Sequence, residues 1–199
     1  MRKREKLVLG VGINDADYPV TKNEVINGKS VQTWICPFYS RWRSMYERCY
    51  SPYYQTVGTT YIGCSVSNDW LYFSEFRSWM ELQDWEGKVL DKDLLVRGNK
   101  VYGPDTCVFI DQKVNNFLTE KPNKNSDLPI GVTPYSKDRS RYKAQCGSDG
   151  KMQYLGIFNS SQEAHEAWLS FKLEQACFLA QDQSDIRVAK ALIYYYENY

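Results

Sequence analysis

Basic and amide side chains recur at every second position in two neighbouring segments around residue 145. Strand side chains point alternately to the two faces of a sheet, so Arg141, Lys143 and Gln145 are expected to share one face. Lys151 and Gln153 alternate in the same way on the following segment, and we expect them on that same face. Cationic side chains bind phosphates and amides can read base edges. The pattern therefore predicts a surface for double-stranded DNA.

The charge distribution supports this prediction. The whole chain of 199 residues carries a net charge of +1. Residues 1–120 are neutral, residues 121–158 carry a net charge of +4, and residues 159–199 carry −3. Such asymmetry is typical of a surface that binds a polyanion. Lys137 and Arg139 lead into the basic strands and are expected to extend the DNA-binding surface.

Three β-rich segments and a helix should position these side chains. The segments are IGVTPYS, RYKAQCGS and KMQYLGIF. Asp149-Gly150 is a strong hairpin signal between the last two. Ser160 and Glu163 have the spacing of a capping box, which predicts that a helix starts there. A last helix is expected from about Ser184.

A second stretch, from Leu90 to Asn116, combines charged residues with an unusual order of elements. A short strand is expected to end at Asp91-Lys92-Asp93, and VRGNKVYGPD has the Gly, Asn and Pro of a long loop. TCVFI predicts the return strand, and Asp111 can cap the helix that follows. We therefore predict a ββα unit over residues 86–118.

The rest of the chain is expected to support these two regions. The first thirty or so residues should form an irregular arm, and the polar residues 119–129 a linker. A helix should begin near Pro37, and a second after VSND. Their expected buried faces comprise Phe38, Trp42, Met45, Tyr46 and Cys49 on the first helix, and Trp70, Phe73, Phe76 and Met80 on the second.

The ββα stretch resembles the HNH (His-Me finger) nuclease motif. The strings RCY, GCSVSNDW and LDKDLL...GNKVYGPDTCVFI, within residues 34–118, are similar to bacteriophage HNH-type endonucleases, many of which are homing nucleases. The resemblance implies that Asp91 and Asn115 bind a divalent metal. It places Lys92 at the general-base histidine and Thr106 near the asparagine that braces the loop.

The C-terminal segment resembles the plant ethylene-response (Apetala) DNA-binding domain, in which a three-stranded sheet lies in the major groove. The strings that carry the likeness are GV, RYKA, YLGIF and EA, over roughly residues 130–180. Together the two resemblances imply an α+β protein. Its expected parts are a nuclease-like domain at 1–118, a linker at 119–129 and a DNA-binding domain plus a C-terminal helix at 130–199.

The lysine at the position of the histidine leaves three interpretations of the site. Neutral imidazole suits proton abstraction near pH 7, whereas a lysine of ordinary pKa is neutral in only about one molecule in two thousand. Lys92 could be a base of lowered pKa, or a cation that binds the phosphate. Asp91, Asp93 and Asn115 could instead hold a hard metal through oxygen ligands, with Mg²⁺ or Mn²⁺ expected. The third interpretation is an inactive site.

The functional alternatives follow from these interpretations. The chain is predicted to be a metal-dependent DNA endonuclease, an inactive remnant that still binds DNA, or an accessory protein that binds a host protein. The only histidine, His165, falls on the C-terminal helix and is expected to be a surface residue. No apolar run has the length of a membrane span, and we expect a cytoplasmic protein, in an infected bacterial host. Its six cysteines include no CxxC pair and are expected to be structural thiols rather than zinc ligands.

Overall fold

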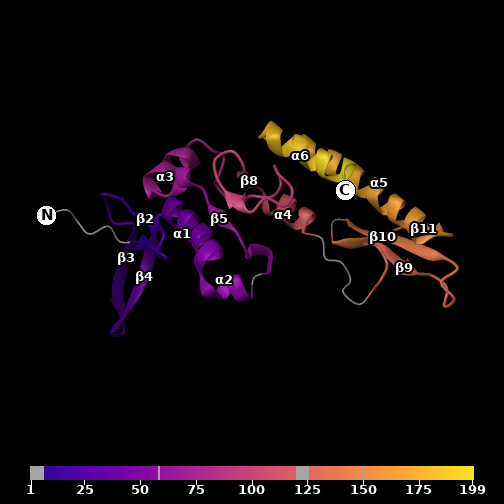
Figure 1. Cartoon of the computed structure of the whole chain (residues 1–199), viewed down its shortest axis with the longest axis horizontal. Coiled ribbons are helices and arrows are strands. Elements are labelled where there is room, and N and C mark those ends of the chain that lie inside the picture. Colours follow the sequence, from indigo (N-terminus) through magenta and orange to yellow (C-terminus); the bar gives the residue numbers. More distant parts are fainter. Residues whose placement is uncertain (1–6, 58, 120–125, 149) are drawn as a thin grey trace. The chain divides into compact units, whose positions relative to one another are not determined.

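The computed structural model describes residues 7–57, 59–119, 126–148 and 150–199. It is a mixed α+β structure with small, mainly antiparallel sheets, which confirms the predicted fold class (Figure 1). The chain divides into two compact units, an N-terminal unit of Met1–Gln112 and a C-terminal unit of Lys113–Tyr199. Most of the predicted linker, residues 120–125, lies outside the described residues.

The prediction of an irregular N-terminal arm is wrong for residues 7–35. Two antiparallel hairpins occupy this segment; their strands are β1 (Leu7–Val8), β2 (Gly12–Ile13), β3 (Thr21–Ile26) and β4 (Lys29–Ile35). Asn27 and Gly28 join β3 to β4 with φ values of 52° and 75°. Positive φ at both central residues is what a type I′ hairpin turn requires, and Asn-Gly is its preferred sequence. That signal is present in the chain and predicts the hairpin.

The predicted helices build the core of the N-terminal unit. The elements are α1 (Pro37–Tyr50), α2 (Pro52–Thr56), η1 (Thr59–Tyr61), β5 (Ser65–Val66), η2 (Asn68–Trp70) and α3 (Phe73–Glu81). The buried faces of α1 and α3 agree with the predicted residues, with two differences: Tyr39 is buried and Phe38 only partly so, and the buried Trp70 lies in η2 rather than in the second helix. Trp42 is fully buried, and its indole N–H donates to the carbonyl of Trp70 at 2.9 Å. This hydrogen bond ties α1 to η2.

The strand–loop–strand–helix order predicted for residues 86–118 is present. β6 (Val89–Asp91) pairs antiparallel with β8 (Val108–Ile110), so that Asp91 lies opposite Val108. Within the long loop, β7 (Val101–Tyr102) pairs in parallel with β5, which the sequence pattern does not predict. Helix α4 (Gln112–Leu118) begins directly after Asp111.

The C-terminal unit contains the predicted three-stranded sheet and two long helices. Its elements are β9 (Val132–Pro134), β10 (Tyr142–Ser148), β11 (Lys151–Phe158), α5 (Ser161–Gln181) and α6 (Ile186–Glu197). The sheet is antiparallel with β10 in the centre. Ser160 Oγ accepts the N–H of Glu163 at 3.1 Å, which confirms the predicted cap. A Cβ atom at Gly131 would lie 2.1 Å from the ring of Trp168, so only glycine allows α5 to pack this closely.

The register of β10 and β11, which contains one β-bulge, decides which side chains share a face of this sheet. Ala144 lies opposite Gly156 and Gln145 opposite Tyr154, so Leu155 is an extra residue on β11. Directly opposed residues of antiparallel strands point to the same face. Gln153 therefore shares a face with Cys146, whose thiol contacts the Gln175 side chain of α5 at 3.6 Å.

The prediction that Lys151 and Gln153 lie on the same face as Lys143 and Gln145 is consequently wrong. Strict alternation holds for β10, and the hairpin register sets Lys151 opposite Ser148 and Gln153 opposite Cys146, on the face away from Lys143 and Gln145. Lys151 lies opposite Ser148, on the face that α5 covers. Both β11 side chains are nevertheless solvent-exposed.

Candidate functional site

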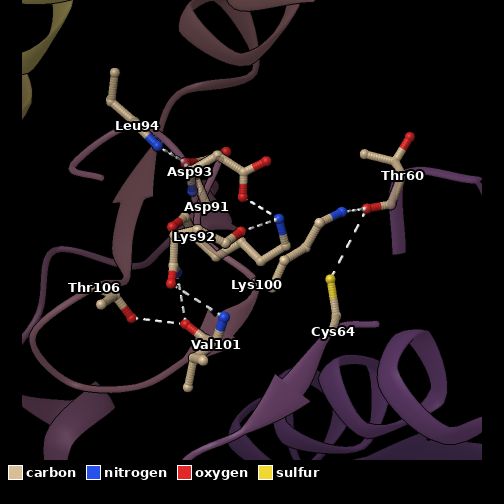
Figure 2. Close-up of polar contacts among 10 residues, drawn as sticks. Thr60, Cys64, Asp91, Lys92, Asp93, Leu94, Lys100, Val101 and Thr106 are labelled. Atoms are coloured by element: carbon tan, nitrogen blue, oxygen red, sulfur yellow. Dashed lines mark hydrogen bonds and ion pairs between the residues drawn. The ribbon is translucent and has the colours of Figure 1, made fainter. Parts of the chain in front are cut away.

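Asp91 ends strand β6 with its carboxylate held by the backbone. One oxygen, Oδ1, accepts the N–H groups of Asp93 at 2.9 Å and Leu94 at 2.7 Å (Figure 2). Among the described residues, Oδ2 makes no hydrogen bond. Burial raises the pKa of Asp91 above its ordinary value, although the two backbone N–H groups act in the opposite direction. The strand end therefore presents a largely desolvated carboxylate with one oxygen uncommitted.

Lys92 points into the N-terminal unit and is only 4% exposed. Its ammonium group donates to the carboxylate of Asp93, with which it forms an ion pair, and to the carbonyl of Asn99 at 3.0 Å (Figure 2). It also lies 5.9 Å from the centre of the Tyr102 ring. These contacts hold Lys92 as a hydrogen-bond donor.

Two side chains brace the loop between β6 and β8. Thr106 Oγ1 donates to the carbonyl of Val101 at 2.8 Å, consistent with the loop-bracing position that the resemblance assigns to it. Asn99 was not predicted to take part, yet its amide nitrogen donates to the carbonyls of Lys92 and Val101 at 2.8 and 2.7 Å. The sequence signal for this role is an Asn beside Gly98 in a long loop. Backbone carbonyls in such a loop lack the hydrogen bonds of a helix or sheet, and a side-chain amide can supply them.

Asn115 lies on α4, within the C-terminal unit, and is half-buried. Its side-chain amide makes no hydrogen bond within the described parts of the chain. The end of α4 is held by Lys172, whose ammonium group donates to the carbonyl of Phe117 at 3.1 Å and lies 3.8 Å from the centre of that ring. Trp168 and Tyr196 also face this ammonium group. That Asn115 and Asp91 face one another stays a prediction.

Arg48 is a residue of the N-terminal unit that the sequence pattern did not single out for chemistry. It lies in the last turn of α1, and the central carbon of its guanidinium is 5.7 Å from the Tyr61 ring centre and 5.4 Å from that of Tyr102. Lys92 and Arg48 thus lie against the same tyrosine ring. Among the described residues, the Arg48 guanidinium makes no hydrogen bond and no ion pair, and its Nε is buried.

Three cysteines of the N-terminal unit lie close enough to influence one another's charge. Cys49, Cys64 and Cys107 are all buried, and burial raises the pKa of both Cys49 and Cys107 to about 12. Without a metal, these two are therefore protonated at neutral pH. No group of three or more His, Cys, Asp or Glu side chains among the described residues is arranged to hold a metal ion.

The open face of the C-terminal sheet carries a mixed set of side chains. Register places Thr133, Lys143, Gln145, Met152, Tyr154 and Ile157 there. Met152 and Tyr154 are 66% and 59% exposed. Arg141 is exposed at the start of β10 and lies 5.9 Å from the ring centre of Tyr135.

Lys137 and Arg139 precede Arg141 in the loop before β10, and they differ in their contacts. Lys137 is exposed and makes no ion pair with any described residue. Arg139 forms a bidentate ion pair with Asp127, in which its two terminal nitrogens donate to the two carboxylate oxygens at 2.8 and 2.9 Å. That pair neutralises the charge of Arg139, which weakens its expected contribution to DNA binding.

His165 ties α5 to the segment before the sheet. Its Nδ1 lies 2.9 Å from the carbonyl of Ile130, and its ring stacks on Trp168. The carbonyl accepts, so Nδ1 carries the proton. The prediction of a surface position is wrong, because the side chain is half-buried in these contacts.

Comparison with known protein families, with curated proteins and with solved structures gave no match. Within the described ranges, no helix combines the length and the apolar character that crossing a bilayer requires.

Proposed function

We propose that the chain is a metal-dependent DNA endonuclease of the HNH kind, with a C-terminal sheet that binds duplex DNA. The observation that carries the proposal is the Asp91 carboxylate. It is desolvated at the end of β6, oriented by two backbone N–H groups, and followed by a braced loop, a return strand and a helix. A buried carboxylate with a raised pKa is costly to keep, and a bound cation would offset that cost.

Asp91 would hold the cation, and its carboxylate oxygens suit Mg²⁺ or Mn²⁺; Asn115 as the second ligand stays a prediction. When bound, the ion would stabilise negative charge on the phosphate that is cleaved. Asp93 is less suited to act as a third ligand, because its carboxylate is engaged by Lys92. The chain's own residues orient the carboxylate and fix the loop beside it.

The contacts of Lys92 favour a fixed cation over a general base. A base must offer a lone pair to the proton that it removes, whereas the Lys92 nitrogen donates to Asp93 and to the Asn99 carbonyl. The same observation supports a second candidate function, that of a DNA-binding protein whose nuclease site is inactive.

Incubation of the full chain with supercoiled plasmid in Mg²⁺ or Mn²⁺ tests the proposal. We expect nicked or linear product with the wild type and none with Asp91→Ala, while both proteins retain the same affinity for duplex DNA. Duplex binding without cleavage in either metal would select the inactive DNA-binding protein. A wild type that neither cuts nor binds DNA would overturn both candidates.

A further inference from the structure

We propose that Arg48 forms a phosphate-binding site in the N-terminal unit, with its guanidinium as the group that contacts the oxyanion. As a contact to DNA, the inference rests on the proposed function. As a site for a phosphate group, it can be tested without any cleavage.

The first argument is the unused hydrogen-bonding capacity of Arg48. A guanidinium carries five N–H donors that cannot be removed by deprotonation. None of them donates to a described residue, and the Nε–H is shielded from solvent. Leaving a charged donor desolvated without an acceptor is unfavourable. A ligand with several acceptor oxygens would satisfy it.

The second argument is that the surroundings hold the guanidinium in place. Tyr61 and Tyr102 lie against it, and Tyr102 is itself buried. The side-chain amide of Gln55 donates to the carbonyls of Arg48 and Tyr61, at 3.0 Å each, which ties α1 to η1. A guanidinium group that is already fixed by aromatic rings loses little conformational freedom when it binds phosphate through two parallel hydrogen bonds.

The third argument is the local balance of charge. Arg48 and Lys92 approach the same ring, while Asp93, the partner of Lys92, forms no ion pair with Arg48. Arg48 therefore keeps its positive charge without a neutralising carboxylate among the described residues.

Arg43 provides a matched control on the same helix. It is exposed and forms an ion pair with Glu47 at 3.0 Å, so its donors are already engaged. A ligand that binds any surface arginine would affect Arg43 and Arg48 alike. A ligand specific for the proposed site would affect Arg48 alone.

The test is a titration of the full-length protein, observed through its arginine Nε–H resonances by NMR. The two probes are inorganic phosphate and a short duplex DNA. We expect the Arg48 signal to shift saturably with both probes, while the Arg43 signal stays in place. Arg48→Gln should weaken phosphate binding at least about 10-fold and Arg48→Lys less so, with Arg43→Gln within about two-fold of the wild type.

The outcomes separate this inference from the proposed function. Arg48-dependent phosphate binding by a wild type that cuts no plasmid would support the site while the nuclease proposal fails. A shift with phosphate but not with DNA would also support the site and assign it to a free phosphate group. A stationary Arg48 signal with both probes would overturn the inference, even if Arg48→Gln fails to fold. So would a folded Arg48→Gln variant that nicks plasmid and binds phosphate as the wild type does.

Discussion

The two regions with expected roles in DNA chemistry use their cations in opposite ways. In the N-terminal unit, Lys92 is buried and engaged by Asp93 and a carbonyl, and Arg48 is pressed against tyrosine rings. In the C-terminal unit, Lys143 and Arg141 lie on or beside an open sheet face and make no ion pair with any described residue. The first arrangement fixes a few charges for one small group. The second spreads charges over a surface that suits an extended polyanion.

The comparison shows how the energetic cost of burying a cation limits the groups that it can bind. Burying an ammonium or guanidinium group is tolerated only when other groups compensate for the lost water. Each buried cation therefore has a narrow set of possible partners. An exposed cation has no such constraint and acts mainly through long-range attraction, which salt weakens.

The largest effect is expected at Lys92, where the buried arrangement can be tested directly. Lys92→His should raise plasmid cleavage by about 100-fold, because a positioned imidazole base contributes at least that much. Lys92→Arg, which keeps the cation, should retain the wild-type rate. The measurement is the nicking rate in Mg²⁺ as a function of pH.

A loss of cleavage in Lys92→His, combined with retention in Lys92→Arg, would show that the charge itself is required. Cleavage by Lys92→His alone, with an inactive wild type, would identify an inactive HNH scaffold.

Substitutions on the open sheet face should change the salt dependence of DNA binding rather than its pH dependence. Lys143→Gln and Arg141→Gln should each lower the slope of log affinity against log salt by about one unit. Arg139→Gln is the control, and it should change the slope less because Arg139 is already paired with Asp127. Equal effects of all three substitutions on duplex binding would contradict the distinction between free and engaged cations.

A smaller effect is expected at Lys151, and it tests the face that the hairpin register assigns to this side chain. Because Lys151 lies opposite Ser148 on the α5 side, Lys151→Gln should change the salt slope by about half as much as Lys143→Gln, or less. Duplex-binding titrations of the two variants at several salt concentrations measure both slopes. Equal slopes would mean that DNA contacts both faces of the hairpin.

The smallest effect is expected on stability, at Asp91. Its raised pKa means that ionisation of Asp91 destabilises the fold. The penalty is absent below the ordinary pKa of the carboxyl, near 3.8, grows as pH rises from there towards the raised value, and is complete above it. Without metal, Asp91→Asn should therefore stabilise the protein at pH 7 by about 1 kcal/mol, and this gain should vanish in acid. Urea unfolding at pH 7 and in acid measures both, and a loss of stability at pH 7 would contradict the prediction.

Local patterns predicted much of this fold because they report on single elements. The aromatic residues of α1 and α3, the capping residues Ser160 and Glu163, and the order of elements around Asp91 were all readable from spacing. The Asn27-Gly28 hairpin was equally readable and was missed because the surrounding composition suggested a loop.

The site could not be predicted in the same way, because it depends on contacts between elements. The burial of Lys92 follows from the fold of the loop around Asn99, and the contact of Arg48 with Tyr102 joins α1 to β7. The face of Lys151, by contrast, follows from the hairpin register, in which Ser148 lies opposite Lys151. The sequence signal Asp149-Gly150 implies that register, but alternation along each strand has to be combined with the turn to reveal it.

The β3–β4 hairpin also gives the molecule a practical point of attachment. Val25 is 78% exposed, and every residue of both strands is at least partly exposed. The tip of such an element tolerates added sequence, because no residue of either strand is fully buried. A fluorescent or affinity tag placed between Asn27 and Gly28 would report on the protein while both ends of the chain, and the candidate sites, stay unaltered.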